Sequence, residues 1–296
     1  MEAYLRDSGE TLLKRCTSPW TRDYRPEVDV TPELGSKQAA YYQSLIGTLR
    51  WIVELGRADI TMEVSAMASM MALPRQGHLQ QLFHMFAFLK IKHNGSMVFD
   101  PTEPDIDMSQ FVREDWSAAA YGEEKEDLPP NMPEPRGVAF TVRAFVDSDH
   151  AGDITTQRSR TGYLIFLNSA PIYWFSKKQM SVETSSFGSE FIAMKQCCEY
   201  LRGLRYKLRM MGIPVEGPSF IFGDNQSVLS NTPKPHSKLK KKSSSVAFHF
   251  VREGVCKDEW RTTYLNTHYN PSDMLTKSLP GGEKRTRFTG SFLHYN

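Results

Sequence analysis

The stretch 138–153, VAFTVRAFVDSDHAGD, decides the fold of this chain. Its apolar side chains alternate as far as Val146, which is typical of a β-strand with one buried face. Asp147 then ends the strand, at a place where a carboxylate is costly to bury without a cation or a hydrogen-bond donor. The sequence therefore predicts a strand that carries an acidic side chain to one end of a sheet.

Four further strand patterns follow toward the C-terminus. YLIFLN (163–168) and PIYWFS (171–176) predict a hairpin, and SFIFGD (219–224) and EWRTTYLNT (259–267) predict two later strands. A long amphipathic helix is expected over 185–211, and shorter helices are expected in NQSVLSN, VAFHFVREGV and PSDMLTKSL. The order βββαβα-αβα predicts an α/β fold, namely a mixed sheet with helices on both faces.

The half of the chain before this stretch has a different character. Residues 1–36 show little periodicity, so we expect an irregular arm there. Helical spacing of apolar residues then predicts three helices within 36–56, 59–71 and 78–90. Residues 100–137 are acidic and proline-rich, which indicates a linker. The expected organisation is a helical unit over 1–99, a linker over 100–137, an α/β domain over 138–280 and a basic tail over 281–296.

Charge is divided unevenly along the chain. The net charge is +2, but from Ala139 onward 22 Lys/Arg stand against 13 Asp/Glu, which leaves 14 basic and 21 acidic residues for 1–138. This imbalance favours a polyanionic partner for the C-terminal part. The apolar content of 40% and the aromatic content of 11% indicate a globular protein.

Neither a membrane span nor a targeting segment is expected. No apolar run reaches the roughly 18 residues that a span requires, and the polar N-terminus MEAYLRDSGETLLKR is unlike a signal peptide. The four cysteines lack CxxC or Cys/His ligand spacing, which favours buried thiols in a reducing compartment. We therefore expect an intracellular protein, cytoplasmic or nuclear.

Four acidic residues stand in four unlike settings: Asp147, Glu190, Asp224 and Asp273. Asp147 and Asp224 each end a strand pattern, and parallel neighbouring strands would bring both to the sheet end where α/β folds bind ligands. Glu190 lies one turn inside the long helix, and Asp273 lies at the start of the last one. Carboxylates gathered in this way repel one another unless divalent cations lie between them. The pattern favours a two-metal site for phosphoryl transfer.

Simpler interpretations exist for each residue taken alone. Asp224, before Asn225 and Gln226, also fits the N-cap of a helix. The lysine run Lys238, Lys240, Lys241 and Lys242 is either a solvated loop or a contact to a nucleic-acid backbone, and its position after Asn225 and Gln226 favours the backbone contact. The further candidates for nucleic-acid binding are Arg158, Arg160, Lys177, Lys178, Asn225 and Gln226.

An ordered series of motifs resembles a known family. TVRAFVDSDHAGD, QRSRTGYLIFL, PIYWFSKKQ, VETSSFGSEFIAM, GDNQSV, HFVREGV and SDMLTK, in that order, are similar to the ribonuclease H domain of copia-type retrotransposon polyproteins. YYQSLIGTLRWI, RADI and HMFAFLKIKHN resemble the C-terminal end of the reverse transcriptase region that precedes it. The resemblance covers about residues 40–280. The catalytic core of the polymerase would lie upstream, so we expect no polymerase activity in this chain.

The resemblance implies a ribonuclease H-like five-stranded fold and cleavage of the RNA strand of an RNA–DNA hybrid. It implies that Asp147, Glu190, Asp224 and Asp273 hold two Mg²⁺ ions, for which Mn²⁺ could substitute. His268, in the loop before Asp273, is a candidate for an auxiliary role in product release. The alternatives are a catalytically silent nucleic-acid-binding or structural fragment of a truncated retroelement, and a transposase-type strand cleaver, which the SEFIA and SDMLTK motifs disfavour.

Overall fold

The computed structural model describes residues 11–118, 121, 124–237 and 245–295. The chain forms two compact units. Unit 1 combines Met1–Met97 with Lys277–Asn296, and unit 2 is Val98–Thr276. None of the helices in the described part of the chain combines the length and the apolar character that crossing a bilayer requires.

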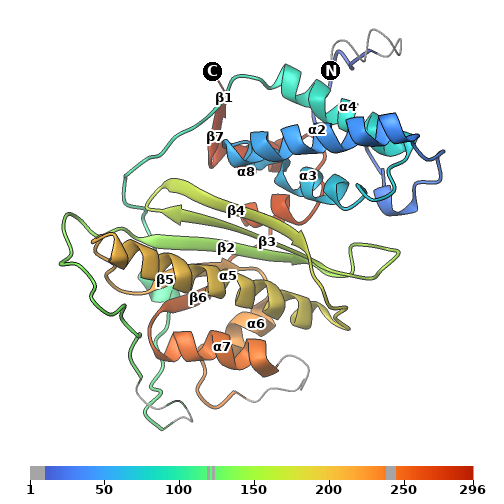
Figure 1. Cartoon of the computed structure of the whole chain (residues 1–296). Helices are drawn as coiled ribbons and strands as arrows, with labels where there is room; N and C mark the ends of the chain where they lie inside the picture. The colour runs from blue at the N-terminus through green and yellow to red at the C-terminus, as the bar shows by residue number, and fades with distance from the viewer. Residues whose placement is uncertain (1–10, 119–120, 122–123, 238–244, 296) are drawn as a thin grey trace. The chain divides into compact units, whose positions relative to one another are not determined.

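Unit 2 contains the predicted five-stranded mixed sheet (Figure 1). Its strands lie in the order β4-β3-β2-β5-β6, in which β3 is antiparallel to β2 and β4, and β5 is parallel to β2 and β6. This is the order third, second, first, fourth, fifth along the unit. The bounds are β2 Val142–Asp149, β3 Arg160–Leu167, β4 Ala170–Lys178, β5 Ser219–Gly223 and β6 Trp260–Tyr264.

Helices α5 (Ser186–Met210) and α7 (Ser245–Cys256) cover one face of this sheet (Figure 1). The predicted alternation of β2 holds, because Val142, Ala144 and Val146 are buried in the same core as α5 and α7. Helix α5 begins where predicted, because the Ser185 side chain accepts a hydrogen bond from the Gly188 amide and so caps the first turn. The cap fixes where the helix begins, and the buried apolar stripe holds its first turn above one end of the sheet.

The opposite face carries aromatic side chains and a short helix. Phe145 stacks on Phe222 with ring centroids 5.0 Å apart, and Phe111 meets the edge of Phe222. Near the end of the sheet, the 3-10 helix η5 (Pro271–Leu275) packs on β3 at Gly162, where any side chain would collide with Leu275 and Thr276. Both faces are therefore covered, with η5 shorter and tighter than the helix expected there.

The acidic segment before the sheet belongs to unit 2, whereas a separate linker over 100–137 was expected. Its described residues have little regular structure apart from the 3-10 helix η3 (Met108–Gln110). Its aromatic residues Phe111 and Trp116 are nonetheless buried, and Glu126 pairs with Arg205 and Arg209 of α5. Isolated buried residues and ion pairs of this kind leave no periodic pattern in the sequence. The acidic, proline-rich composition was therefore the only signal, and it indicated a linker.

Unit 1 contains the three predicted helical stretches. They are α2 (Ser36–Glu54), α3 (Thr61–Ala68) with the preceding 3-10 turn η2 (Ala58–Ile60), and α4 (Gln76–Ile91); a 3-10 turn η1 (Pro26–Val28) lies in the N-terminal arm. A short strand β1 (Gly95–Met97) follows α4.

Residues 277–296 differ from the basic tail expected over 281–296. They form helix α8 (Glu283–Gly290) and strand β7 (Leu293–Tyr295), and β7 pairs antiparallel with β1. Phe288 and Phe292 are buried, and the buried Arg285 donates to the Glu63 carboxylate at 3.2 Å. The basic residues obscured a short amphipathic helix, because one of them is an internal ion-pair partner rather than a solvated charge.

Candidate metal centre

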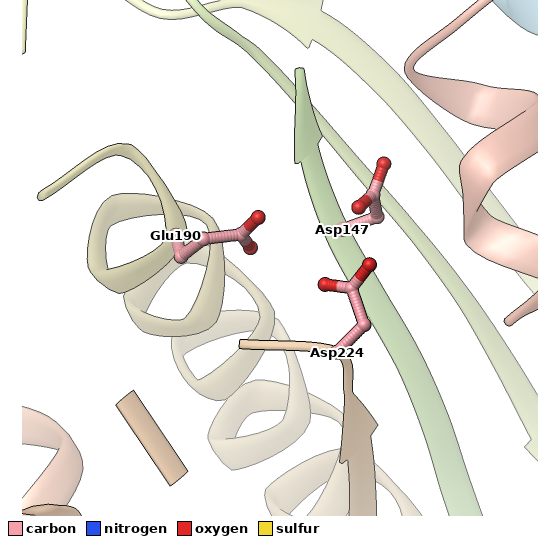
Figure 2. Close-up of side chains that lie close together, drawn as sticks. All are labelled: Asp147, Glu190 and Asp224. Carbon is pink, nitrogen blue, oxygen red and sulfur yellow. The ribbon is translucent and has the colours of Figure 1, made fainter. Parts of the chain in front are cut away.

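Three of the four predicted acids meet at one end of the sheet in unit 2. One carboxylate oxygen from each of Asp147, Glu190 and Asp224 lies within 4.8 Å of the other two. Figure 2 shows the three side chains directed toward one another, from strand β2, from helix α5 and from the residue after β5. Asp147 is buried, whereas Glu190 and Asp224 are partly exposed. A substrate could therefore reach the cluster from the side of Glu190 and Asp224.

The pairing of β2 with β5 explains why Asp147 and Asp224 are neighbours. The two strands are parallel, and Phe145 is the register partner of Phe222. Two residues further along each strand, the same register reaches Asp147 and Asp224. Carboxyl ends of parallel strands meet at one sheet edge, so the predicted placement of these two acids follows from topology alone.

Helix α5 brings the third carboxylate. Glu190 is the fifth residue of the helix, and its neighbour Phe191 is fully buried in the core of unit 2. Burial of Phe191 sets the rotation of the helix at this point, because the apolar stripe must face the sheet. Glu190 then lies at the border of that stripe and turns toward the strand ends (Figure 2).

Asp147 is held by the segment that follows η5. Its Oδ2 accepts a hydrogen bond from the hydroxyl of Thr276, which also donates to the Asp273 carbonyl at 3.1 Å. Gly162, the register partner of Asp147 on β3, leaves the space in which Leu275 and Thr276 pack. A side chain at position 162 would push this segment away, so the glycine is required by close packing.

The chemistry of the three acids fits a hard divalent cation. Like charges at this separation destabilise one another, and the ionised state is favoured when a cation lies between them. Carboxylate oxygens are the ligands that Mg²⁺ and Mn²⁺ prefer, and Mg²⁺ is commonly held by few carboxylates together with water and substrate phosphate. The partly exposed positions of Glu190 and Asp224 leave room for such additional ligands.

Asp273 does not join these three carboxylates within 4.8 Å. It is buried in η5, and its Oδ2 accepts from Thr267 Oγ1 at 3.3 Å. His268 is exposed in the loop before η5. Roles for Asp273 and His268 therefore remain predictions.

The predicted nucleic-acid contacts fall into several groups. Arg160, at the start of β3, pairs with Asp149 at the end of β2 and with Lys178 at the end of β4. Both basic residues therefore lie at the acidic end of the sheet. Arg160 donates to Ser176 Oγ at 3.2 Å, and Lys178 pairs with Asp153. Lys177 is exposed and Arg158 is partly exposed.

The remaining candidates lie after β5. Asn225 caps α6 (Gln226–Asn231), because its Oδ1 accepts from the Val228 amide at 3.1 Å. The N-cap that was considered for Asp224 is therefore provided by Asn225, and Gln226 is exposed. The predictions for Lys238, Lys240, Lys241 and Lys242 lie outside the described residues.

Two residues of the site were not singled out from the sequence: Gly162 and Thr276. Thr276 lies within the quoted motif SDMLTK, three residues after Asp273, but nothing in its local pattern points to Asp147. Gly162 directly precedes the predicted strand 163–168, whereas β3 begins at Arg160; a glycine inside a strand often marks close approach of another backbone, but the predicted bounds left this glycine outside the strand.

The strand order and the position of the acids define a class of protein. A mixed sheet in the order third, second, first, fourth, fifth, with acids after the first and fourth strands and on the helix between them, is a ribonuclease H-like α/β fold. A solved structure of similar fold is RNase H1 of the halophilic archaeon Halobacterium salinarum, with a TM-score of 0.36 and 14% identity, covering 46% of this chain and 94% of that one.

Sequence relatives identify the setting of this fold. The chain is 26% identical over 240 residues to the retrovirus-related Pol polyprotein from transposon RE1 of Arabidopsis thaliana, and covers 14% of that protein. It is 23% identical over 248 residues to the corresponding polyprotein from transposon TNT 1-94 of Nicotiana tabacum, and covers 16% of it. These matches span 80% and 84% of this chain. No family model matches the chain. The predicted resemblance to copia-type retrotransposon polyproteins is confirmed, and the chain spans only a small part of these relatives.

Proposed function

We propose that unit 2 is a metal-dependent ribonuclease H that hydrolyses the RNA strand of RNA–DNA hybrids and serves the replication polyprotein of a retroelement. The observation that carries the proposal is the meeting of Asp147, Glu190 and Asp224 at one end of the sheet. The ribonuclease H-like strand order and the similarity to retrotransposon polyproteins support it.

In this proposal the three carboxylates hold two Mg²⁺ ions, and Asp273 is the candidate for a fourth ligand. When bound, the ions would supply an activated water and stabilise the charge that develops on the leaving oxygen. The protein contributes orientation: the Thr276 hydroxyl fixes one oxygen of Asp147, and helix α5 holds Glu190 over the strand ends. Arg160 and Lys177, near the same end of the sheet, would contact phosphates of the hybrid, and the 2′-hydroxyl would mark the RNA strand.

Cleavage of a labelled RNA–DNA hybrid in Mg²⁺ tests this function. We expect the wild type to cut only the RNA strand, with Mn²⁺ able to replace Mg²⁺ and EDTA abolishing cleavage. Asp224→Asn should lose nearly all cleavage because one charged metal ligand is removed. Glu216→Gln is the matched control, since Glu216 is an exposed acid in the loop before β5, away from the carboxyl end where Asp224 stands.

The outcomes separate the nuclease from a silent fragment. Absence of hybrid-specific cleavage, or cleavage unchanged in Asp224→Asn, would exclude the nuclease. Binding of the hybrid without cleavage and without a metal requirement would instead favour a catalytically silent nucleic-acid-binding fragment.

A further inference from the structure

A buried glutamine connects two of the elements that form the acidic cluster. Gln179 directly follows β4, and only 1% of its surface is exposed. Its Nε2 donates to Thr161 Oγ1 on β3 at 3.1 Å and to the carbonyl of Ser189 in α5 at 2.9 Å. Thr161 and Ser189 are fully buried. The amide therefore bridges the sheet and the first turn of the helix, at the residue that precedes Glu190.

The same segment of β3 also positions Asp147, on the other face of the sheet. Thr161 points toward α5, so its neighbour Gly162 faces the opposite side. There Leu275 and Thr276 pack against Gly162, and Thr276 donates to Asp147. Two consecutive residues of one strand thus set the positions of the helix that carries Glu190 and of the segment that holds Asp147.

General stabilisation of the fold does not account well for an amide at position 179. A buried amide is costly unless its polar atoms are hydrogen-bonded. Gln179 Oε1 has no partner among the described residues of the protein. An apolar side chain of similar length would fill the same space without that cost. What the amide adds is the pair of hydrogen bonds from Nε2, one to β3 and one to the residue of α5 that precedes Glu190.

We propose that Gln179 is a positioning residue for the metal centre. This proposal rests on the function proposed above. It holds the Ser189–Glu190 turn of α5 against β3 and thereby keeps the Glu190 carboxylate at the distance from Asp147 and Asp224 that one set of cations can span. Gln179 touches neither substrate nor reacting atoms and acts through Glu190. Groups that orient metal ligands in this way typically change metal affinity or activity by about 10- to 100-fold when they are removed.

The test is the metal affinity of the full-length chain without nucleic acid. Mn²⁺ binding is measured by calorimetry for the wild type, for Gln179→Met, and for Gln196→Met as the matched control. Methionine keeps the length of the side chain and removes the donor. Gln196 is another glutamine with a buried oxygen, but it lies further along α5 from Glu190. We expect Mn²⁺ affinity to fall by about 10-fold in Gln179→Met and to stay unchanged in Gln196→Met.

Cleavage supplies a second readout that a purely structural role would not change. In Gln179→Met the Mg²⁺ concentration for half-maximal cleavage should rise by a similar factor. At saturating Mg²⁺ the KM for the hybrid should equal that of the wild type, because the nucleic-acid contacts are untouched. A folded Gln179→Met chain that binds Mn²⁺ as tightly as Gln196→Met would overturn the proposal.

Further outcomes remain decisive. If Gln179→Met does not fold by circular dichroism, Thr161→Val removes only the acceptor hydroxyl, and Mn²⁺ affinity unchanged in that variant would overturn the proposal. A wild type that binds Mn²⁺ but does not cut hybrids would exclude the nuclease alone, and the role of Gln179 would be decided by Mn²⁺ binding. A wild type that binds no Mn²⁺ would overturn both.

Discussion

The two ends of helix α5 carry charge in opposite ways. Near its start, Glu190 joins Asp147 and Asp224, so three groups of the same sign lie within 4.8 Å of one another. Near its end, Arg205 and Arg209 both hydrogen-bond to the carboxylate of Glu126, at distances between 2.5 and 2.8 Å. One end gathers like charges, and the other pairs opposite charges within the protein.

The difference separates a charge cluster that is balanced within the protein from one that, in the proposed function, bound cations would balance. At the Glu126 end the buried charges satisfy one another, and the pairing ties the acidic segment to the helix. At the Glu190 end the gathered acids raise the free energy of the folded protein until cations bind.

Removing one charge from the acidic end should have the largest effect on activity. We expect Asp147→Asn to lower single-turnover cleavage by at least about 100-fold, since loss of an outer-shell group alone can cost that much. Without metal, the variant should unfold at a temperature equal to or above that of the wild type, because repulsion among the acids is reduced.

Thermal denaturation in EDTA checks this expectation. Asp115→Asn is the control, because Asp115 is exposed and lies outside the cluster. A clear loss of stability of Asp147→Asn in EDTA would mean that the acidic end is balanced within the protein, and the contrast between the two ends would fail.

Removing the acid from the paired end should act on stability instead. Glu126→Gln leaves Arg205 and Arg209 buried beside a neutral amide, and breaking a buried pair in this way costs about 3 kcal/mol. Urea denaturation measures the loss. Well below the midpoint, Mn²⁺ affinity and cleavage should be those of the wild type, because this end does not take part in metal binding.

Glu124→Gln is the matched control for the paired end. Glu124 is half-exposed and reaches Lys257 at 3.5 Å, so its loss should cost less than about 1 kcal/mol. Equal destabilisation by the two variants, or loss of Mn²⁺ affinity in Glu126→Gln, would show that the ends are not separable.

Lowering the pH should remove the stabilisation of the folded protein that Glu126 provides, over a defined pH range. Burial alone would raise the pKa of this carboxyl, but hydrogen bonds from Arg205 and Arg209 lower it from 4.5 to about 2. A pKa lowered by folding gives stability that is present above the unfolded pKa and is lost as pH falls toward the folded pKa. The stability difference between wild type and Glu126→Gln should therefore be constant above pH 5 and shrink between about pH 4.5 and 2. A difference that persists at pH 2 would contradict the assignment.

Much of this contrast could be predicted from the sequence, but not all of it. Apolar patterns predicted β2 and β5 as strands, each ending at an acid, so Asp147 and Asp224 were expected to meet if the strands were parallel neighbours, and the structure shows that they are. Glu126 was hidden in a proline-rich segment, because its two partners lie about 80 residues away and long-range ion pairs leave no local pattern. The role of Asp273 stays a prediction: the residue lies in a 3-10 helix where a longer helix was expected, and five residues of sequence do not distinguish the two.

Surface charge should give the smallest and most graded effect. Lys177 is exposed near the acidic end. If it contacts a phosphate, its removal should reduce the slope of log affinity against log salt concentration by about 1. We expect Lys177→Gln to raise the KM for the hybrid a few-fold at low salt, with kcat unchanged because no metal ligand is disturbed.

Lys207→Gln makes the same charge change at the paired end of α5, where Lys207 is also exposed. If the substrate lies only at the end where like charges gather, the salt dependence of Lys207→Gln will be that of the wild type. KM is measured for both variants between about 50 and 200 mM salt. Over this range the affinity of a protein with roughly six to ten phosphate contacts falls by about 10³ or more. Equally reduced slopes for the two variants would mean that the nucleic acid contacts both regions rather than the acidic end alone. The charge pattern of α5 would then no longer indicate where the substrate binds.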